Sequence, residues 1–192
     1  MKRNTFLQML MGTTALVTVS MNGLGKGLTK FRVKAGFKVD TGKDRFKKTI
    51  TLMEGDTFFT KVSTKDTDGD IYVYESTRSK EGGPAHHYYF SQDEWWYILQ
   101  GEFLIKTGET TYHAKAGDSV FGPRMVPHSF AKIGEGDGRL LQFFQPAGKM
   151  EEFFTKVSLG AAKGMTEAEQ DKFREAHGFK RVGPAIQNFK KI

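Results

Sequence analysis

The sequence predicts an all-β protein, built as an antiparallel sandwich or barrel. Short runs of strand-forming residues are separated by turn residues about every eight to twelve positions, and no long helical pattern interrupts them before Lys149. The 192 residues include 17 phenylalanines, and aromatic side chains pack well on a pleated sheet. A chain of this length is expected to form one domain with a sizeable core.

Composition and charge exclude several classes of protein. Hydrophobic residues make up 38% and charged residues 27% of the chain, as in ordinary soluble globular proteins. The absence of cysteine excludes disulfides, thiolate metal ligands and a cysteine nucleophile. The net charge is +7, but the basic residues are scattered and often stand beside acidic ones. This pattern favours a solvated basic surface, and we expect no nucleic-acid partner.

The N-terminal residues 1–22 have the layout of a secretory signal peptide. Two basic residues, Lys2 and Arg3, precede an apolar run over residues 6–19, which small residues follow. The run is too short and too polar to span a bilayer, so we expect no stable membrane insertion. The alternatives are a disordered start or an apolar first helix packed on the domain. A signal peptide makes the protein periplasmic or secreted, and the glycine-rich residues 23–30 then form a linker.

Strand-like runs follow one another over residues 31–148, the expected extent of the β domain. The expected strands are residues 31–33, 57–62, 71–75, 86–89, 94–100, 103–106, 111–114, 119–121, 128–133 and 140–145. The acidic segment 65–70 faintly resembles a calcium loop. However, Gly69 comes too early and no glutamate stands at the last ligand position, so a hairpin turn is expected there.

Residues 149–192 are expected to form a short helical tail. Residues 151–157 carry phenylalanine and valine side chains that suit one packed helix. Thr166 and Glu169 have the spacing of a capping box that begins a second helix, and Gly178 ends that helix. We expect both helices to pack on the outside of the β domain.

The candidate functional residues begin in the stretch 82–102, which predicts two strands separated by a polar break. Successive residues of a strand point to opposite faces, so His87 and Tyr89 share one face of the first strand. His86 points to the other face. Glu94 begins the inner face of the second strand. If the two strands form a hairpin, His87 and Glu94 meet near its end.

A second cluster, residues 117–130, supplies His128. Two imidazoles and one carboxylate form the ligand set of non-haem Fe(II) oxygenases, which keep positions open for substrate and oxygen. The sequence therefore indicates a metal site formed by His87, Glu94 and His128. The alternative is that these histidines are structural, as we interpret His113.

The two clusters resemble the two motifs of the cupin family. The first motif holds a pair of histidines, a glutamate and a glycine, and the second holds Gly-Asp, proline and one histidine. The residues at matching positions are His87, Glu94, Gly101, Gly117, Asp118, Pro123, Pro127 and His128. Tyr89 stands where the first motif has its second histidine. Including weaker likenesses, the resemblance covers roughly residues 30–185 and is to bacterial single-domain cupins similar to quercetin dioxygenases.

The resemblance implies a cupin jelly-roll barrel over residues 31–148 with a short C-terminal helical annex. It also implies a divalent transition metal, such as Fe, Mn, Ni, Cu or Zn, bound by His87, Glu94 and His128. Tyr89 is then either a phenolate ligand or a hydrogen-bonding wall, and a weak or absent metal is the alternative. Glu94 is the implied catalytic residue, which takes a proton from the substrate.

Three functions are compatible with this resemblance. The first is a metal-dependent dioxygenase similar to quercetinase, acting on a small aromatic or enol substrate. The second is a non-catalytic cupin that binds a small molecule, which the substitution at Tyr89 favours. The third is another cupin enzyme, such as an isomerase of a sugar or a keto acid.

A mostly aromatic set of side chains is expected to line the substrate pocket. These residues are Tyr89, Trp96, Ile98, Phe121, Met125 and Phe130. The alternative is that they form only the barrel core. Trp95, Tyr97 and Leu99 face the opposite way, and an apolar outer face needs cover from the tail helices, another sheet or a second subunit. Because cupins commonly pair as dimers, the resemblance implies a homodimer.

Overall fold

The computed structural model describes residues 32–52 and 56–187, and the predicted signal peptide and linker lie outside these residues. The strands and helices of the described part are β1 (Ile50–Thr51), β2 (Thr57–Val62), α2 (Thr64–Thr67), β3 (Tyr72–Arg78), β4 (Ala85–Tyr89), β5 (Asp93–Gln100), β6 (Glu102–Thr107), β7 (Thr110–Lys115), β8 (Ser119–Gly122), β9 (His128–Ile133), β10 (Gly138–Gln145), α3 (Met150–Ser158), α4 (Glu167–Ala176) and β11 (Phe179–Ala185). Within this part of the chain, no helix is long and apolar enough to cross a membrane.

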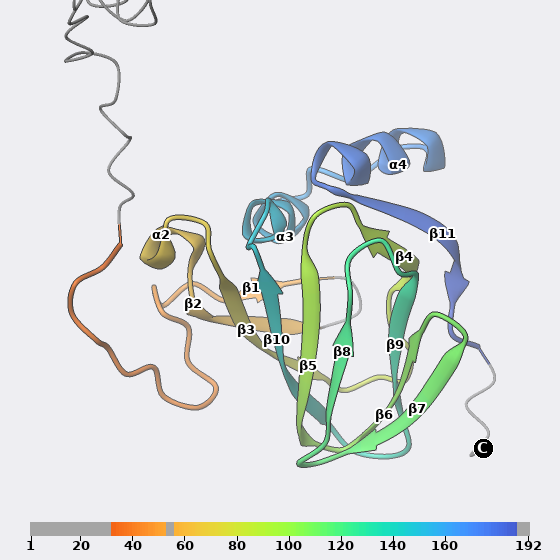
Figure 1. Ribbon diagram of the computed structural model, residues 1–192, viewed down its shortest axis with the longest axis horizontal. Helices are drawn as coiled ribbons and strands as arrows, with labels where there is room; N and C mark the ends of the chain where they lie inside the picture. The colour runs from red at the N-terminus through yellow and green to blue at the C-terminus, as the bar shows by residue number, and fades with distance from the viewer. Residues whose placement is uncertain (1–31, 53–55, 188–192) are drawn as a thin grey trace, which may run out of the picture. The chain divides into compact units, whose positions relative to one another are not determined.

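The strands form two sheets that face each other (Figure 1). The first sheet has the order β1-β2-β3-β10-β5-β8, and the second has the order β11-β4-β9-β6-β7. Neighbouring strands are antiparallel, as β10 is to both β3 and β5. Alternate residues of β5 are buried between the sheets and exposed outside them, as expected for two packed antiparallel sheets. The predicted all-β jelly-roll architecture is confirmed.

β4 and β5 do not form the hairpin that the sequence left open. β5 pairs with β10 and β8 in the first sheet, whereas β4 pairs with β9 and β11 in the second. Residues 90–92 carry the chain from one sheet to the other, and the N–H of Phe90 donates to the carbonyl of Gly178 at 2.9 Å. The inner faces of β4 and β5 therefore meet across the barrel and not along one sheet.

The first part of the described chain also differs from prediction. Residues 32 and 33 are not in a strand, and the N–H of Val33 donates to the carbonyl of Asp66 at 3.0 Å. In place of the hairpin turn expected at 65–70, the one-turn helix α2 covers residues 64–67. Ser63 and Asp66 form a capping box that satisfies the N–H groups at its start, and this local bonding favours a helical turn.

The C-terminal tail is helical only in part (Figure 1). α3 and α4 confirm the two predicted helices, and α4 begins with the predicted capping box. Residues 179–185 instead form β11, the edge strand that pairs with β4. Phe179 explains why this segment joins the sheet. Its ring is buried, and the ring centroid lies 4.9 Å from that of Phe153 and 5.5 Å from that of Tyr89. Burying an aromatic ring compensates for ordering the tail as a strand.

Two groups of apolar side chains fill the interior. One group contains Tyr89, Phe144 and side chains of α3, and the other contains Trp96, Phe130 and their neighbours on β6. The ring of His128 lies 5.4 Å from the rings of both Tyr89 and Trp96. His128 therefore marks a polar position between the two apolar groups.

Candidate metal centre

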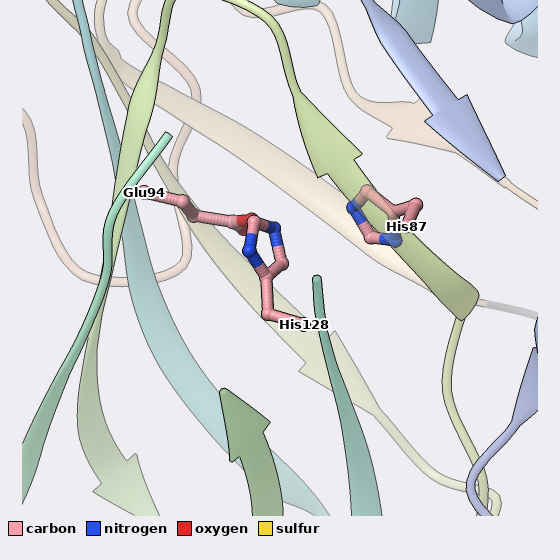
Figure 2. A group of neighbouring side chains, drawn as sticks. All are labelled: His87, Glu94 and His128. Atoms are coloured by element: carbon pink, nitrogen blue, oxygen red, sulfur yellow. The ribbon is translucent and has the colours of Figure 1, made fainter. Parts of the chain in front are cut away.

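Three side chains from three strands converge inside the barrel (Figure 2). His87 lies on β4, Glu94 on β5 and His128 on β9. One potential ligand atom of each residue lies within 4.8 Å of the other two. The residues are 7%, 2% and 0% exposed, respectively. The structure thus brings the three predicted residues together in the interior.

Strand pairing explains this convergence. His87 and His128 are directly opposite each other in the β4–β9 pair, and their ring centroids are 4.8 Å apart. Glu94 comes from the facing sheet, where it is opposite Phe144 of β10 and Gly122 of β8. His87 and Glu94 occupy the buried positions of the alternating strands β4 and β5, and His128 lies on β9, where every residue is buried.

Glu94 and His128 turn two hydrogen-bond acceptors toward each other. Oε2 of Glu94 and Nε2 of His128 are 3.1 Å apart, yet neither atom makes a hydrogen bond. Nδ1 of His128 lies 2.9 Å from the carbonyl oxygen of Val126, which only accepts, so the hydrogen of the neutral ring is on Nδ1. An unpaired buried acceptor costs about 1–3 kcal/mol. A divalent cation would satisfy both lone pairs, and the residues therefore fit a metal; a proton on either group is the alternative.

His87 is a neutral imidazole with a defined tautomer. Its Nδ1 donates to the carbonyl of Ala85 at 2.7 Å, which leaves the lone pair on Nε2. Burial, and then the neighbouring His128, lower the pKa of His87 to about 3. The ring therefore does not have to lose a proton at neutral pH before Nε2 can bind a metal.

Tyr89 is the hydrogen-bond partner of Nε2 of His87. Its hydroxyl oxygen lies 3.2 Å from Nε2 of His87, and the residue is only 3% exposed. Burial, and then the charge of Glu94, raise the pKa of Tyr89 well above its ordinary value. Tyr89 is therefore a neutral phenol that donates to His87, as the predicted hydrogen-bonding wall requires.

Comparison with known proteins agrees with this fold. Residues 69–144 match the family model described as the cupin domain. These residues form a cupin domain. They begin before β3, end within β10 and contain His87, Glu94 and His128, which are called the triad below. No curated protein matches the sequence.

Solved structures similar to the cupin domain include three bacterial proteins. KdgF from a Halomonas species has 19% sequence identity and a TM-score of 0.45, over 52% of this chain and 86% of that chain. A predicted oxalate decarboxylase from Thermotoga maritima has 20% identity and a TM-score of 0.46, over 52% and 90%. An RmlC-like cupin from Shewanella frigidimarina has 21% identity and a TM-score of 0.43, over 55% and 87%.

Gln142 holds Glu94 in place but was not among the residues predicted from the sequence. Gln142 lies on β10, is 2% exposed, and donates from Nε2 to Oε1 of Glu94 at 2.6 Å. The available signal was strand parity. Gln142 is a polar residue between Leu140 and Phe144, at an inward position of a strand whose other inward residues are apolar or glycine.

Gly122 was also missed, although it makes room for the site. A Cβ atom at this position would lie 2.8 Å from two ring carbons of Trp96 and 3.4 Å from Nδ1 of His128. Glycine is therefore the residue that lets β8 approach the Trp96 ring in the cupin domain. The sequence of β8 did not indicate that Gly122 points inward, because a four-residue strand is too short to show its parity clearly.

Four of the six predicted pocket residues lie in the interior of the cupin domain. Tyr89, Trp96, Ile98 and Phe130 are each at most 4% exposed. The rings of Tyr89 and Trp96 lie against His128, and Ile98 and Phe130 belong to the same apolar group as Trp96. A cavity of about 710 Å³ is lined by residues between 38 and 49 and by Phe59, and not by the triad.

The prediction that Phe121 and Met125 line the pocket is wrong. They are 56% and 58% exposed, respectively. Gly122 takes the inward position of β8, so Phe121 points outward, where it is opposite Trp95. Met125 lies in the turn before β9 with a φ of 62°, and its N–H donates to the carbonyl of Tyr89 at 2.8 Å.

The remaining histidines have partners outside the triad. His86 lies 3.0 Å from Oγ of Ser129 through Nδ1, on the outward side of β4. His113 bonds Glu102 at 2.6 Å on the surface. His177 donates from Nδ1 to the carbonyl of Phe173 at 2.7 Å, near the end of α4. His86 thus points away from the triad as expected, and the contact of His113 agrees with its structural interpretation.

Proposed function

We propose that the cupin domain is a metal-dependent dioxygenase that acts on a small aromatic or enol substrate. A divalent transition-metal ion would be held by His87, Glu94 and His128. The observation that carries this proposal is the pair of facing acceptors on Glu94 and His128, 3.1 Å apart and without hydrogen bonds. A buried pair of this kind needs a cation or a proton between its atoms.

The donor set supports oxygenase chemistry. Two neutral imidazoles and one carboxylate suit Fe(II), Mn and related ions and leave positions open for other ligands. When bound, such an ion supplies a net positive charge that favours an anionic substrate oxygen and activates dioxygen. The buried triad, closed off by aromatic side chains, excludes water from the reacting groups.

Glu94 has the arrangement of a proton acceptor. Its Oε1 is fixed by Gln142, while Oε2 has no hydrogen bond and faces the interior. Oε2 can therefore receive the proton of a substrate hydroxyl without giving up its link to the sheet. An enol or phenol of the substrate would lose its proton in this step.

One observation favours the second candidate, a non-catalytic small-molecule-binding cupin. Tyr89 occupies the position of a motif histidine, so the cupin domain offers only two imidazoles at this site. The phenol of Tyr89 keeps its proton and bonds His87, so it does not replace the missing ligand. A centre with fewer ligands binds metal less tightly. A weakly held metal would serve as a binding anchor for a ligand and not as a catalyst.

Oxygen uptake separates the two candidates. Purified protein is reconstituted in separate samples with Fe²⁺, Mn²⁺, Ni²⁺ and Cu²⁺ and mixed with a panel of flavonols and simpler enols. We expect metal-dependent oxygen consumption that falls by about 10²-fold or more in Glu94→Gln, since a general base contributes that much. His113→Gln is the control, because this surface histidine bonds only Glu102.

Two outcomes would contradict the dioxygenase. The first is equal oxygen uptake by the wild type and Glu94→Gln, which would place the chemistry elsewhere. The second is ligand binding without any oxygen uptake, measured by calorimetry on the same panel. That result would favour the non-catalytic binding protein.

A further inference from the structure

The three ligand atoms of the triad differ in how freely they can bind a metal. Nε2 of His128 and Oε2 of Glu94 have no hydrogen-bond partner. Nε2 of His87 has one, because the hydroxyl of Tyr89 lies 3.2 Å away. In Figure 2, the side chains of Glu94 and His128 lie close together, and the ring of His87 lies apart from them.

The direction of the bond between Tyr89 and His87 follows from the other side of the His87 ring. Nδ1 of His87 lies 2.7 Å from the carbonyl oxygen of Ala85 and must donate to it. An imidazole that can bind a metal carries one hydrogen, and the bond to Ala85 places it on Nδ1, so Nε2 carries only a lone pair. The hydroxyl of Tyr89 is then the donor, and it occupies the lone pair that a metal would use.

Packing holds Tyr89 in this position. The centroid of its ring lies 5.3 Å from that of Phe144, 5.5 Å from that of Phe179 and 5.4 Å from that of His128. Only 3% of the residue is exposed. The N–H of Met125 also bonds the carbonyl of Tyr89 at 2.8 Å, which fixes its backbone. A side chain confined in this way keeps its hydrogen bond for most of the time.

We propose that Tyr89 blocks the ligand nitrogen of His87, so that a metal binds first to Glu94 and His128 and reaches His87 only when this hydroxyl is displaced. This inference rests on the proposed metal site and adds a residue that sets its affinity. Tyr89 is a positioning residue in this account. It lowers the affinity for metal and is not a ligand.

The test is the Tyr89→Phe variant, which removes one oxygen atom and leaves the ring packing in place. Co²⁺ is the probe, and its dissociation constant is measured by competition with a chelator. Because the net value of one hydrogen bond is modest, we expect Tyr89→Phe to bind Co²⁺ about two- to tenfold more tightly than the wild type. Tyr88→Phe is the matched control, since Tyr88 lies on the opposite face of β4 and contacts Phe90, and it should bind like the wild type.

A second measurement does not depend on the metal. The ¹⁵N chemical shift of His87 Nε2 in the metal-free protein reports whether its lone pair accepts a hydrogen bond. We expect this shift to change in Tyr89→Phe and to stay at the wild-type value in Tyr88→Phe.

The outcomes distinguish this inference from the proposed function. Equal Co²⁺ affinity in Tyr89→Phe and the wild type would overturn the blocking role, and weaker binding would overturn it by showing Tyr89 to be a ligand. An unchanged ¹⁵N shift would also overturn it. No Co²⁺ binding in any variant would overturn the proposed metal site, while the ¹⁵N shift would still decide whether Tyr89 holds His87.

Discussion

The carboxylate of Glu94 has one fixed oxygen and one without a hydrogen bond. Gln142 donates to Oε1 at 2.6 Å, whereas Oε2 faces Nε2 of His128. Hydrogen bonds to charged groups are among the stronger ones in proteins. The orientation of the carboxylate in the candidate centre therefore depends on a residue outside the triad.

A double-mutant cycle on Glu94 and Gln142 tests this bond. Gln142→Leu leaves Oε1 of Glu94 without a donor, and we expect the free energy of unfolding to fall by about 1.5–3 kcal/mol. In a Glu94→Leu background the same change should cost much less, because no carboxylate remains to be satisfied. Urea unfolding of the four proteins gives the coupling energy, and additive costs would contradict the bond.

Single residues show which buried positions could be predicted from the sequence and which could not. The alternation of Asp93–Gln100 placed Glu94, Trp96 and Ile98 inside, and all three are buried. The same reasoning failed for Phe121, because its apolar character suggested an inward position that Gly122 actually takes. Which parity of a short strand faces inward depends on neighbours that only the fold brings together.

Beyond single residues, the N-terminal segment 40–45 is held to the outer side of β3 by Glu75. The carboxylate of Glu75 pairs with Lys61 at 2.9 Å and Arg139 at 2.5 Å and accepts from the N–H of Gly42 at 3.2 Å. Lys61 also donates to the carbonyls of Asp40 and Lys43, each at 2.9 Å. Burial raises the pKa of Glu75, but the bonds from Arg139, Lys61 and Gly42 outweigh it, and the net pKa is lowered.

This lowered pKa predicts how stability depends on pH. A carboxylate with a lower pKa in the folded protein stabilises it above the unfolded value of 4.5, and that contribution is lost as the pH falls through the folded pKa. We expect the wild type to be more stable than Glu75→Gln at pH 7, with the difference shrinking below about pH 4.5. Urea unfolding from pH 7 to pH 3 measures it, and a difference that stays constant would contradict the prediction.

The strands themselves were largely predictable, but their partners were not. The run 128–133 was predicted with the bounds that β9 has in the structure. The pairing of β4 with β9 and β11 joins residues far apart in the chain, and local patterns carry no signal for such contacts. The charged residues and the Gly183-Pro184 pair of β11 also resembled a tail more than a strand.

For the molecule as a whole, one aromatic surface has no cover within the described residues. Phe121, Trp95 and Phe143 form a row across the outer face of β8, β5 and β10, with the rings of Trp95 and Phe143 at 4.7 Å. Trp95 is 38% and Phe121 56% exposed. α3 and α4 pack mainly against β1 and β11, respectively, so the tail helices, one of the three covers that the sequence left open, do not cover this surface.

We expect a second copy of the chain to cover this aromatic row. The double variant Trp95→Lys, Phe121→Lys should then sediment as a monomer at concentrations where the wild type is a dimer, because two buried charges oppose association. Tyr112→Lys is the control, since Tyr112 is 44% exposed on β7 of the other sheet. A wild type that sediments as a monomer at micromolar concentration would refute the dimer.

The measurement that tests the central claim most directly is the metal content of the protein after incubation with Co²⁺ and removal of the excess. Only one candidate metal group exists among the described residues, formed by His87, Glu94 and His128. We predict about one bound ion per chain in the wild type and in His113→Gln, and far less in His128→Gln, because the loss of one of three ligands weakens a site strongly. Circular dichroism verifies that the variants are folded. No metal in the wild type, or equal metal in His128→Gln, would contradict the account.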